Sequence, residues 1–126
     1  MAMITPLKRA RGLGSAKEGP GHFMHQRLTA ALNLVLVPFA IGLIATLAGA
    51  DLAVVKSTLA RPIVAILLVA FILSMAVHMR IGMQVIIEDY VHEEKTKLAL
   101  ILLNTFYVVV VGLAAVYAIL KLSFGV

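Results

Sequence analysis

The stretch FILSMAVHMRIGMQVIIEDYVH, which runs from Phe71 to His92, determines how the rest of the sequence is interpreted. It begins as an apolar helix, places His78 among apolar neighbours and ends in the acidic and aromatic cluster Glu88 to Tyr90. Because a helix advances by about 100° per residue, a possible metal ligand, a small residue and a carboxylate share one face. The residues of this face are Phe71, Ser74, Met75, His78, Gly82, Val85 and Asp89. We interpret this stretch as the functional helix of a bundle.

The composition indicates a membrane protein. Of the 126 residues, 62% are hydrophobic and 13% are charged, and the mean hydropathy is +1.04. A soluble domain has about 45–50% apolar and about 25% charged residues. The absence of cysteine excludes disulfides, thiolate zinc sites and an iron–sulfur cluster held by this chain alone. The net charge of +5 comes from basic residues that do not alternate with aromatic ones, so we expect contact with anionic lipid and not with nucleic acid.

Three apolar stretches are long enough to cross a bilayer. Residues 28–50 and 98–120 each form a run of 23 residues without a charge. A hydrocarbon core of about 30 Å requires roughly 20 helical residues. The remaining stretch, about 62–88, is interrupted only by Arg80 before its acidic end. The sequence therefore predicts an all-α membrane protein with three transmembrane helices.

The segments outside these spans are polar. Residues 1–27 form a basic arm whose glycines predict that it contains no regular helix. The chain thus divides into this arm and a three-helix membrane anchor domain, residues 28–126. A short loop is expected at 51–61 and a charged connection at 91–97. Pro38 is expected to bend the first span.

The basic residues predict the orientation of the chain in the membrane. Five of them precede the first span, two lie in the 51–61 loop and one lies near the C-terminus. The positive-inside rule then places the N-terminus and the 91–97 connection in the cytoplasm. Because two spans separate Arg27 from Tyr90, this topology brings the two residues to the same membrane surface.

His78 is the candidate metal ligand. An ionisable residue inside a span is costly and suggests a function by default. A neutral imidazole can ligate haem iron, and Gly82, one turn further on, would leave room for a flat macrocycle. The alternative is a histidine that only forms a hydrogen bond to a neighbouring helix. Because His22, His25 and His92 lie at or beyond the membrane edge, a second haem ligand would have to come from another subunit.

Three further candidates gather at the predicted cytoplasmic surface. Tyr90 occupies an interfacial position at which tyrosine commonly anchors a helix. A phenol beside the Asp89 carboxylate is also able to donate a hydrogen bond to a quinone carbonyl. Arg27 either binds lipid headgroups or pairs with a carboxylate such as a haem propionate.

Arg80, Gln84 and Glu88 follow one another at intervals of four residues on a different face of the same helix. Arg80 can extend toward the interface or pair with Glu88 through Gln84, and we favour such a structural role over a contact with a cofactor. The sequence contains no recognisable nucleophile motif, phosphate-binding loop or spacing of metal ligands.

One pattern in the predicted second span resembles a known family. It has the form H-x-x-x-G-x-x-x-x-x-x-D-Y-V and consists of His78, Gly82, Asp89, Tyr90 and Val91. The pattern resembles the hydrophobic membrane anchor of succinate dehydrogenase, its small cytochrome b-type subunit. The segment GLGSAKEGPGHFMHQRLTA, with Arg27 ahead of the first span, is similar to the alphaproteobacterial branch of that family. The resemblance covers nearly the whole chain, although Arg80 stands where relatives often carry a bulkier apolar residue.

The resemblance implies a subunit that is not catalytic alone. His78 would be one axial ligand of a haem b in a bundle shared with the large cytochrome b anchor subunit, which supplies the other histidine. Tyr90 would bind ubiquinone, Asp89 would support that site, and Arg27 would lie near a haem propionate or the quinone. A flavoprotein subunit and an iron–sulfur subunit would dock on the cytoplasmic face of the bacterial inner membrane.

Two other interpretations remain open at this point. The first is a b-type cytochrome anchor of another quinone-linked dehydrogenase, fumarate reductase above all. The second is a small transport or structural membrane protein in which His78 only packs against a neighbouring helix.

Overall fold

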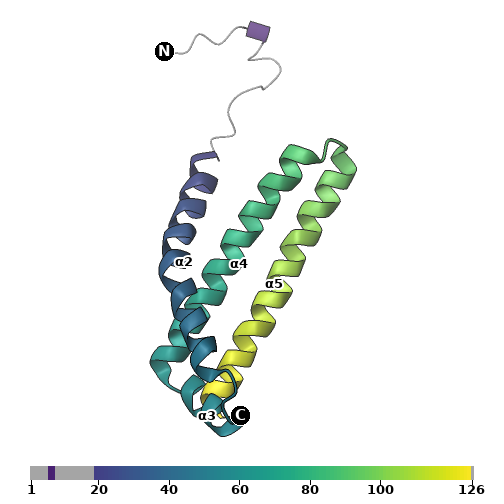
Figure 1. The fold of residues 1–126 in the computed structure, drawn as a ribbon. Helices are drawn as coiled ribbons and strands as arrows, with labels where there is room; N and C mark the ends of the chain where they lie inside the picture. Colours follow the sequence, from purple (N-terminus) through teal and green to yellow (C-terminus); the bar gives the residue numbers. More distant parts are fainter. Residues whose placement is uncertain (1–5, 8–18, 126) are drawn as a thin grey trace.

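The computed structural model describes residues 6–7 and 19–125, and this part of the chain contains helices and no strand. Three long helices, α2 (Gly19–Leu47), α4 (Pro62–Tyr90) and α5 (Glu94–Phe124), run antiparallel to one another in chain order (Figure 1). The short helix α3 (Leu52–Leu59) connects α2 to α4. Each long helix is long and apolar enough to cross a membrane. The prediction of an all-α protein with three spans is confirmed.

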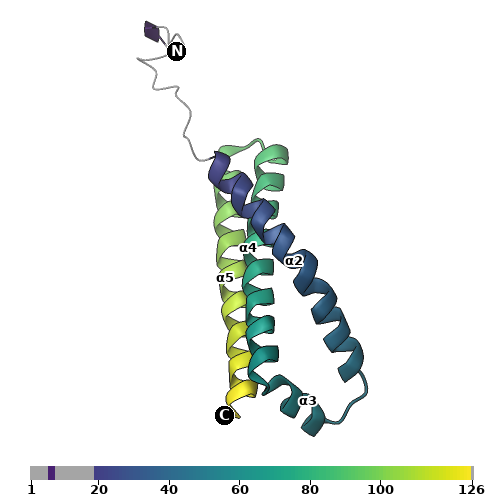
Figure 2. The same ribbon diagram turned by 90° about the vertical axis from the view of Figure 1, so that its left-hand side faces the viewer.

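Helix α4 lies at the centre of the bundle, because α2 and α5 each pack against it. Toward α5 the packing is close and apolar: a Cβ added to Gly112 would lie 3.8 Å from the Cβ of Ala76. Small residues of this kind let membrane helices approach one another. Helix α2 crosses α4 and diverges from it toward the α3 end (Figure 2).

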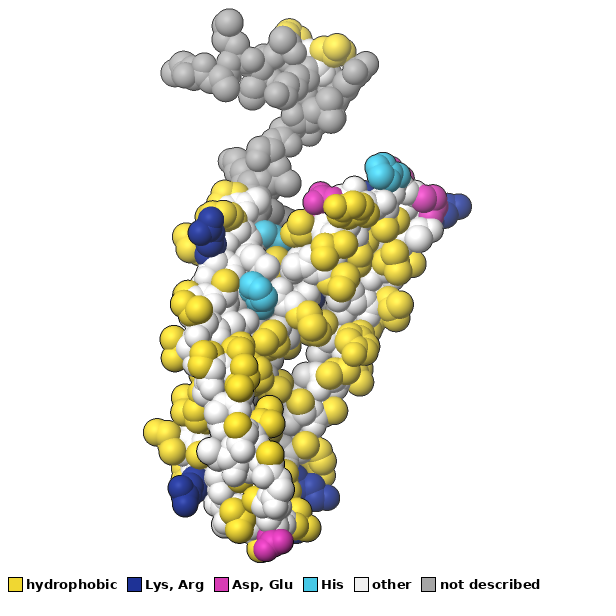
Figure 3. All heavy atoms as spheres, in the orientation of Figure 1, with side chains coloured by type: hydrophobic (Ala, Val, Ile, Leu, Met, Phe, Trp, Pro, Cys, Tyr) yellow, Lys and Arg dark blue, Asp and Glu magenta, His cyan; other side chains and the backbone are white. Residues whose placement is uncertain are grey.

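Few side chains of the described chain are buried. The residues with 4–8% exposure are Asn33, Leu36, Ala40, Ala65, Ser74, Ile81, Ile87 and Val108. Most large apolar side chains are exposed along the length of the helices, and most charged side chains lie at the two ends of the bundle (Figure 3). An apolar surface of this extent suits contact with lipid or with another membrane subunit, and not with water.

Helix α2 begins earlier than the glycine content predicted. It starts at Gly19, so the expectation of no regular helix was wrong for residues 19–27, and Arg27 belongs to α2. Pro20 lies in the first turn, where its missing N–H costs nothing and its fixed φ favours the helix. The part of the basic arm that carries Lys8, Arg9, Arg11 and Lys17 lies outside the described residues.

The expected loop at 51–61 contains a helix of its own, α3, so that prediction was wrong. The turn before it is made by Gly49, whose φ of 79° is the left-handed conformation that glycine adopts without strain. After α3, Pro62 occupies the first turn of α4, where its missing N–H costs nothing. Pro38 is accommodated inside α2, which continues to Leu47, and the bend at this residue stays a prediction.

The connection between α4 and α5 is short because α5 begins at Glu94, directly after a side-chain cap. The Glu93 carboxylate accepts hydrogen bonds from the backbone N–H of Lys95 at 3.2 Å and of Thr96 at 2.7 Å. The Thr96 hydroxyl donates to the same carboxylate. Such a cap satisfies backbone donors that the first helical turn cannot pair internally.

This cap predicts a pH-dependent first turn of α5. The hydrogen bonds from the Thr96 side chain and backbone, and then from Lys95, hold the pKa of Glu93 below its ordinary value of 4.5. Because the folded-state pKa is depressed, the stabilising effect of the cap is present above the unfolded-state pKa and is lost as the pH falls through the folded-state value. We expect the hydrogen-exchange protection of the Thr96 amide to fall over that acidic range. In Glu93→Gln the protection should be lower and should not depend on pH, and an identical pH profile for the two proteins would contradict this assignment.

Candidate functional site

His78 lies on the side of α4 that faces α2, and it is half-buried. Its Nδ1 is 3.1 Å from Oγ1 of Thr29, which lies on α2, a distance at which the two atoms share a hydrogen bond. The Thr29 hydroxyl also lies 2.8 Å from the His25 carbonyl oxygen and 3.2 Å from the Gln26 carbonyl oxygen. One turn away, Ser74 donates a hydrogen bond of 3.4 Å to the Thr29 carbonyl. The candidate ligand is thus held by the neighbouring helix through its Nδ1 atom.

The opposite ring nitrogen of His78, Nε2, makes no hydrogen bond within residues 19–125. The buried side-chain atoms of these residues that lack a partner are Gln26 Oε1 and Asn33 Oδ1, and Nε2 of His78 is not among them. Within the described residues, Nε2 of the half-buried His78 is therefore not fully buried. The hydrogen bond to Thr29 is the structural alternative that the sequence left open, but it occupies only one of the two nitrogens and leaves the other able to bind a metal ion.

Gly82 lies against α2. A Cβ added at this position would lie 3.5 Å from Nε2 of Gln26, which is an ordinary van der Waals distance. Within this chain, the glycine thus faces a polar side chain of α2, one turn beyond the contact between His78 and Thr29. The expectation that Gly82 leaves room for a macrocycle stays a prediction.

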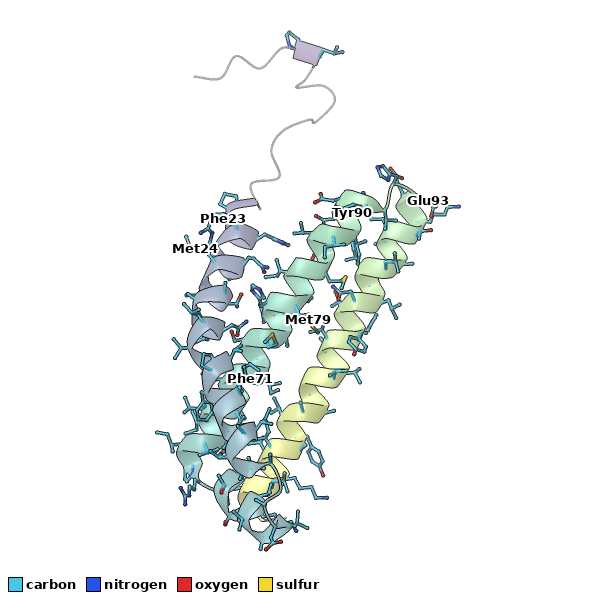
Figure 4. All side chains as sticks on the ribbon, in the orientation of Figure 1. Phe23, Met24, Phe71, Met79, Tyr90 and Glu93 are labelled. Atoms are coloured by element: carbon cyan, nitrogen blue, oxygen red, sulfur yellow. The ribbon has the colours of Figure 1, made fainter. Side chains whose placement is uncertain are left out.

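Helix α4 ends at the candidate interfacial residues. Asp89 and Tyr90 form its last turn, and Tyr90 is 79% exposed. Arg27 is exposed on α2, one turn after Phe23, and its guanidinium carbon lies 5.0 Å from the centre of the Phe23 ring, within the range of a cation–π contact. Phe23 and Tyr90 lie at the same end of the bundle (Figure 4). The described structure therefore brings Arg27, Asp89 and Tyr90 to one end, as the three spans predicted, but shows no hydrogen bond among them.

Arg80 projects away from His78, toward the other neighbour of α4. Together with Val108 and Gly112 of α5, it lines an apolar cavity of about 370 Å³ between the two helices. Its backbone carbonyl accepts a hydrogen bond of 3.0 Å from Nδ2 of Asn104 on α5. Met79, next to His78 in the sequence, also lies on the side of α5 (Figure 4).

The expected polar row on α4 is formed in part. Gln84 donates a hydrogen bond of 2.8 Å to Glu88, at the predicted interval of four residues. Lys97 of α5 donates to the Glu88 carbonyl oxygen at 3.1 Å. Within the described part of the chain, the guanidinium of Arg80 forms no ion pair with Glu88. The polar row therefore connects α4 to α5 at the end of the hairpin, through Glu88, and does not include Arg80.

Thr29 is the residue of this site that sequence reasoning missed. Its neighbours Gln26 and Asn33 lie three residues before and four residues after it, so the three polar side chains occupy one face of an otherwise apolar helix. Gln26 and Thr29 are half-buried and Asn33 is 8% exposed, which shows that this face is turned inward. A polar row at helical spacing was the available signal, and it pointed to the side of α2 that meets α4.

Comparison with known proteins decides the family. Residues 1–112 match the model of the family described as succinate dehydrogenase/fumarate reductase transmembrane subunit. The chain belongs to this family. The matched region contains α2, α3, α4 and most of α5, and therefore every candidate residue described above.

Individual relatives within the family of succinate dehydrogenase/fumarate reductase transmembrane subunits match most of the chain. The succinate dehydrogenase hydrophobic membrane anchor subunit of Paracoccus denitrificans is 33% identical over 125 residues, which cover 99% of this chain and 96% of the relative. The subunit of the same name from Rickettsia bellii is 33% identical over 111 residues, 88% of this chain and 89% of that protein. These matches confirm the resemblance predicted from the motif on α4 and from the residues around Arg27.

Proposed function

We propose that this chain is the membrane anchor subunit of a succinate:ubiquinone oxidoreductase and is not catalytic by itself. The observation that carries the proposal is the match over nearly their full lengths to the Paracoccus denitrificans protein, which is named as a succinate dehydrogenase anchor subunit. Three apolar helices whose surfaces are largely exposed are consistent with a chain that lies in the membrane beside a second membrane subunit. The names of the relatives favour succinate dehydrogenase over fumarate reductase, although the family model includes both.

The chain supplies one half of a haem b site. His78 offers an Nε2 that is not fully buried, and the hydrogen bond from its Nδ1 to Thr29 is the kind of outer contact that orients a ligating imidazole. A second histidine on this chain does not meet it: His22 and His25 are exposed in the first two turns of α2, and His92 follows the end of α4. The donor set therefore fits one of the two histidines that would hold the haem iron, and the large cytochrome b subunit would supply the other. When bound, the haem takes up and releases single electrons.

The quinone site is formed at the end of α4. Tyr90 extends from the last turn with its phenol exposed, where it donates a hydrogen bond to a carbonyl oxygen of ubiquinone. Asp89, its neighbour, accepts hydrogen bonds and maintains a polar surrounding for that phenol. Arg27, on the same end of the bundle, supplies a positive charge toward a haem propionate or the quinone.

The same end of the bundle faces the cytoplasm of the bacterial cell. Basic residues are concentrated before and at the start of α2, which favours this orientation in the inner membrane under the positive-inside rule. The iron–sulfur subunit and the flavoprotein subunit dock there, so that electrons released from succinate reach the quinone beside Tyr90. Anionic lipid headgroups neutralise the remaining basic residues of the arm.

Purification of the complex through an affinity tag on this chain tests the proposed function. The complex should contain a flavoprotein that oxidises succinate, should reduce ubiquinone and should show a b-type haem band in its reduced-minus-oxidised spectrum. A copurified flavoprotein that acts on another substrate would overturn the assignment to succinate dehydrogenase. A complex without haem would remove the haem site from the proposal.

A further inference from the structure

We infer that Thr29 is the positioning residue of His78: its hydroxyl accepts a hydrogen bond from Nδ1–H, holds the imidazole in one tautomer and leaves the Nε2 lone pair for the haem iron. The inference rests on the proposed haem site, because the choice of tautomer has a chemical consequence only if His78 is a ligand. It assigns a role to a residue of α2 that touches no haem atom itself.

The direction of the hydrogen bond follows from the number of protons available. A threonine hydroxyl has one O–H and two lone pairs. Oγ1 of Thr29 lies 2.8 Å from the carbonyl oxygen of His25 and 3.2 Å from that of Gln26, and both of these oxygens can only accept. The hydroxyl proton is therefore directed to the helix backbone, and a lone pair points toward His78. At 3.1 Å, His78 Nδ1 must then be the donor, which places the proton on Nδ1 and the lone pair on Nε2.

Two features hold the acceptor in place. Threonine in a helix has few χ1 rotamers, and one that bonds the carbonyl of the preceding turn is well populated. Ser74, which is 5% exposed, donates a hydrogen bond of 3.4 Å to the Thr29 carbonyl and so ties α4 to α2 one turn from His78. The imidazole is thus held by a hydrogen bond to a fixed position on α2. It cannot rotate about its χ2 angle without losing the hydrogen bond to Thr29.

The tautomer affects both the binding and the potential of the haem. An imidazole protonated on Nε2 has no free lone pair on that nitrogen with which to bind iron. An imidazole protonated on Nδ1 keeps the Nε2 lone pair and can bind iron through it. Donation of Nδ1–H to an acceptor also increases the basicity of the ligand, which stabilises ferric over ferrous haem. Without Thr29, the N–H would remain unpaired in a poorly solvated environment, and the ring would lose its preferred orientation.

The test is the replacement Thr29→Val in the complete complex, with Thr29→Ser as the conservative variant. Valine preserves the shape of the side chain and removes the acceptor, so we expect the haem midpoint potential to rise, the low-spin ferric electron paramagnetic resonance signal to change, and the affinity for haem to fall by about 10–100-fold. Serine keeps the hydroxyl and should restore all three properties. Thr105→Val is the matched control, because Thr105 Oγ1 also donates to the carbonyl four residues earlier, at 2.9 Å from Ile101, on the α5 side of the bundle.

The outcomes separate this inference from the haem site itself. If Thr29→Val keeps the wild-type potential and signal while His78→Ala loses the haem, the role of Thr29 is overturned and the haem site stands. If the wild-type complex contains no haem, both fail. Should Thr29→Val prevent assembly, Thr29→Ala carries the same comparison with Thr29→Ser. Equal effects of Thr29→Val and Thr105→Val would also overturn the inference, because they would reflect a general loss of helix packing.

Discussion

The variant His78→Ala is expected to abolish the b-type haem band of the assembled complex. Alanine removes the imidazole that α4 presents toward α2, so the proposed haem would keep only the ligand from the large cytochrome subunit. Loss of an outer contact to a metal-binding histidine already costs about 10–100-fold in affinity, and loss of the ligand itself should cost more. We therefore expect haem content to fall roughly tenfold or more in the purified complex, measured from the reduced-minus-oxidised spectrum.

The matched control is His92→Ala. His92 is also a histidine of this chain, but it is exposed in the connection after α4 and its Nδ1 contacts the Tyr90 carbonyl at 3.2 Å. Its removal should leave the haem band unchanged. A full-intensity band in His78→Ala, in a complex that contains this chain in normal amount, would show that His78 only connects two helices.

The three spans could be predicted because bilayer thickness alone imposes them. Runs of 23 residues without a charge leave no other stable structure in hydrocarbon, and the structure places α2 and α5 over those runs. The ends of the helices were predicted less accurately, since α2 begins at Gly19 and the helix α3 occupies the expected loop. Glycine predicts a break only in a helix interior, and its cost in the first turn, next to Pro20, is small.

Local contacts were easier to predict than contacts between helices. The bond between Gln84 and Glu88 follows from their interval of four residues on one helix. The contact between His78 and Thr29 joins residues 49 positions apart and depends on how α2 crosses α4. Helices that are apolar on most sides give little periodicity from which the packed face can be deduced, and on α2 the short polar row around Thr29 was the available signal. The sequence therefore identified the candidate ligand but not the residue that orients it.

Arg80 lies on the other side of α4, away from His78. It lies two residues after His78, and residues at this interval point about 200° apart around a helix, which agrees with the structural role expected for this side chain. In the structure it lines the α4–α5 cavity, and its carbonyl binds Asn104. The bulky cation is thus accommodated by α5.

The variant Tyr90→Phe is expected to reduce kcat/KM for ubiquinone by roughly 10- to 100-fold, while oxidation of succinate with an artificial acceptor that takes electrons before the membrane subunits stays unchanged. Phenylalanine keeps the ring and removes the O–H that would polarise the quinone carbonyl. A positioned proton donor contributes about 10²–10⁴-fold, and water can replace part of this at a phenol that is 79% exposed. The loss should therefore lie at or below the lower end of that range. The haem spectrum should be unchanged, since the phenol is not a ligand.

The matched control for this prediction is Tyr117→Phe. Tyr117 is 66% exposed on α5, one turn before Lys121 in the last turn of that helix. This end of α5 lies at the opposite end of the bundle from Tyr90. Tyr117 has the same chemistry and a similar exposure but no access to a quinone bound near the end of α4. Equal effects of the two replacements would show that Tyr90 only anchors α4 at the membrane surface. A selective loss in Tyr90→Phe would place quinone reduction at the end of α4, about 12 residues or three turns from His78, so that the two redox sites share one helix.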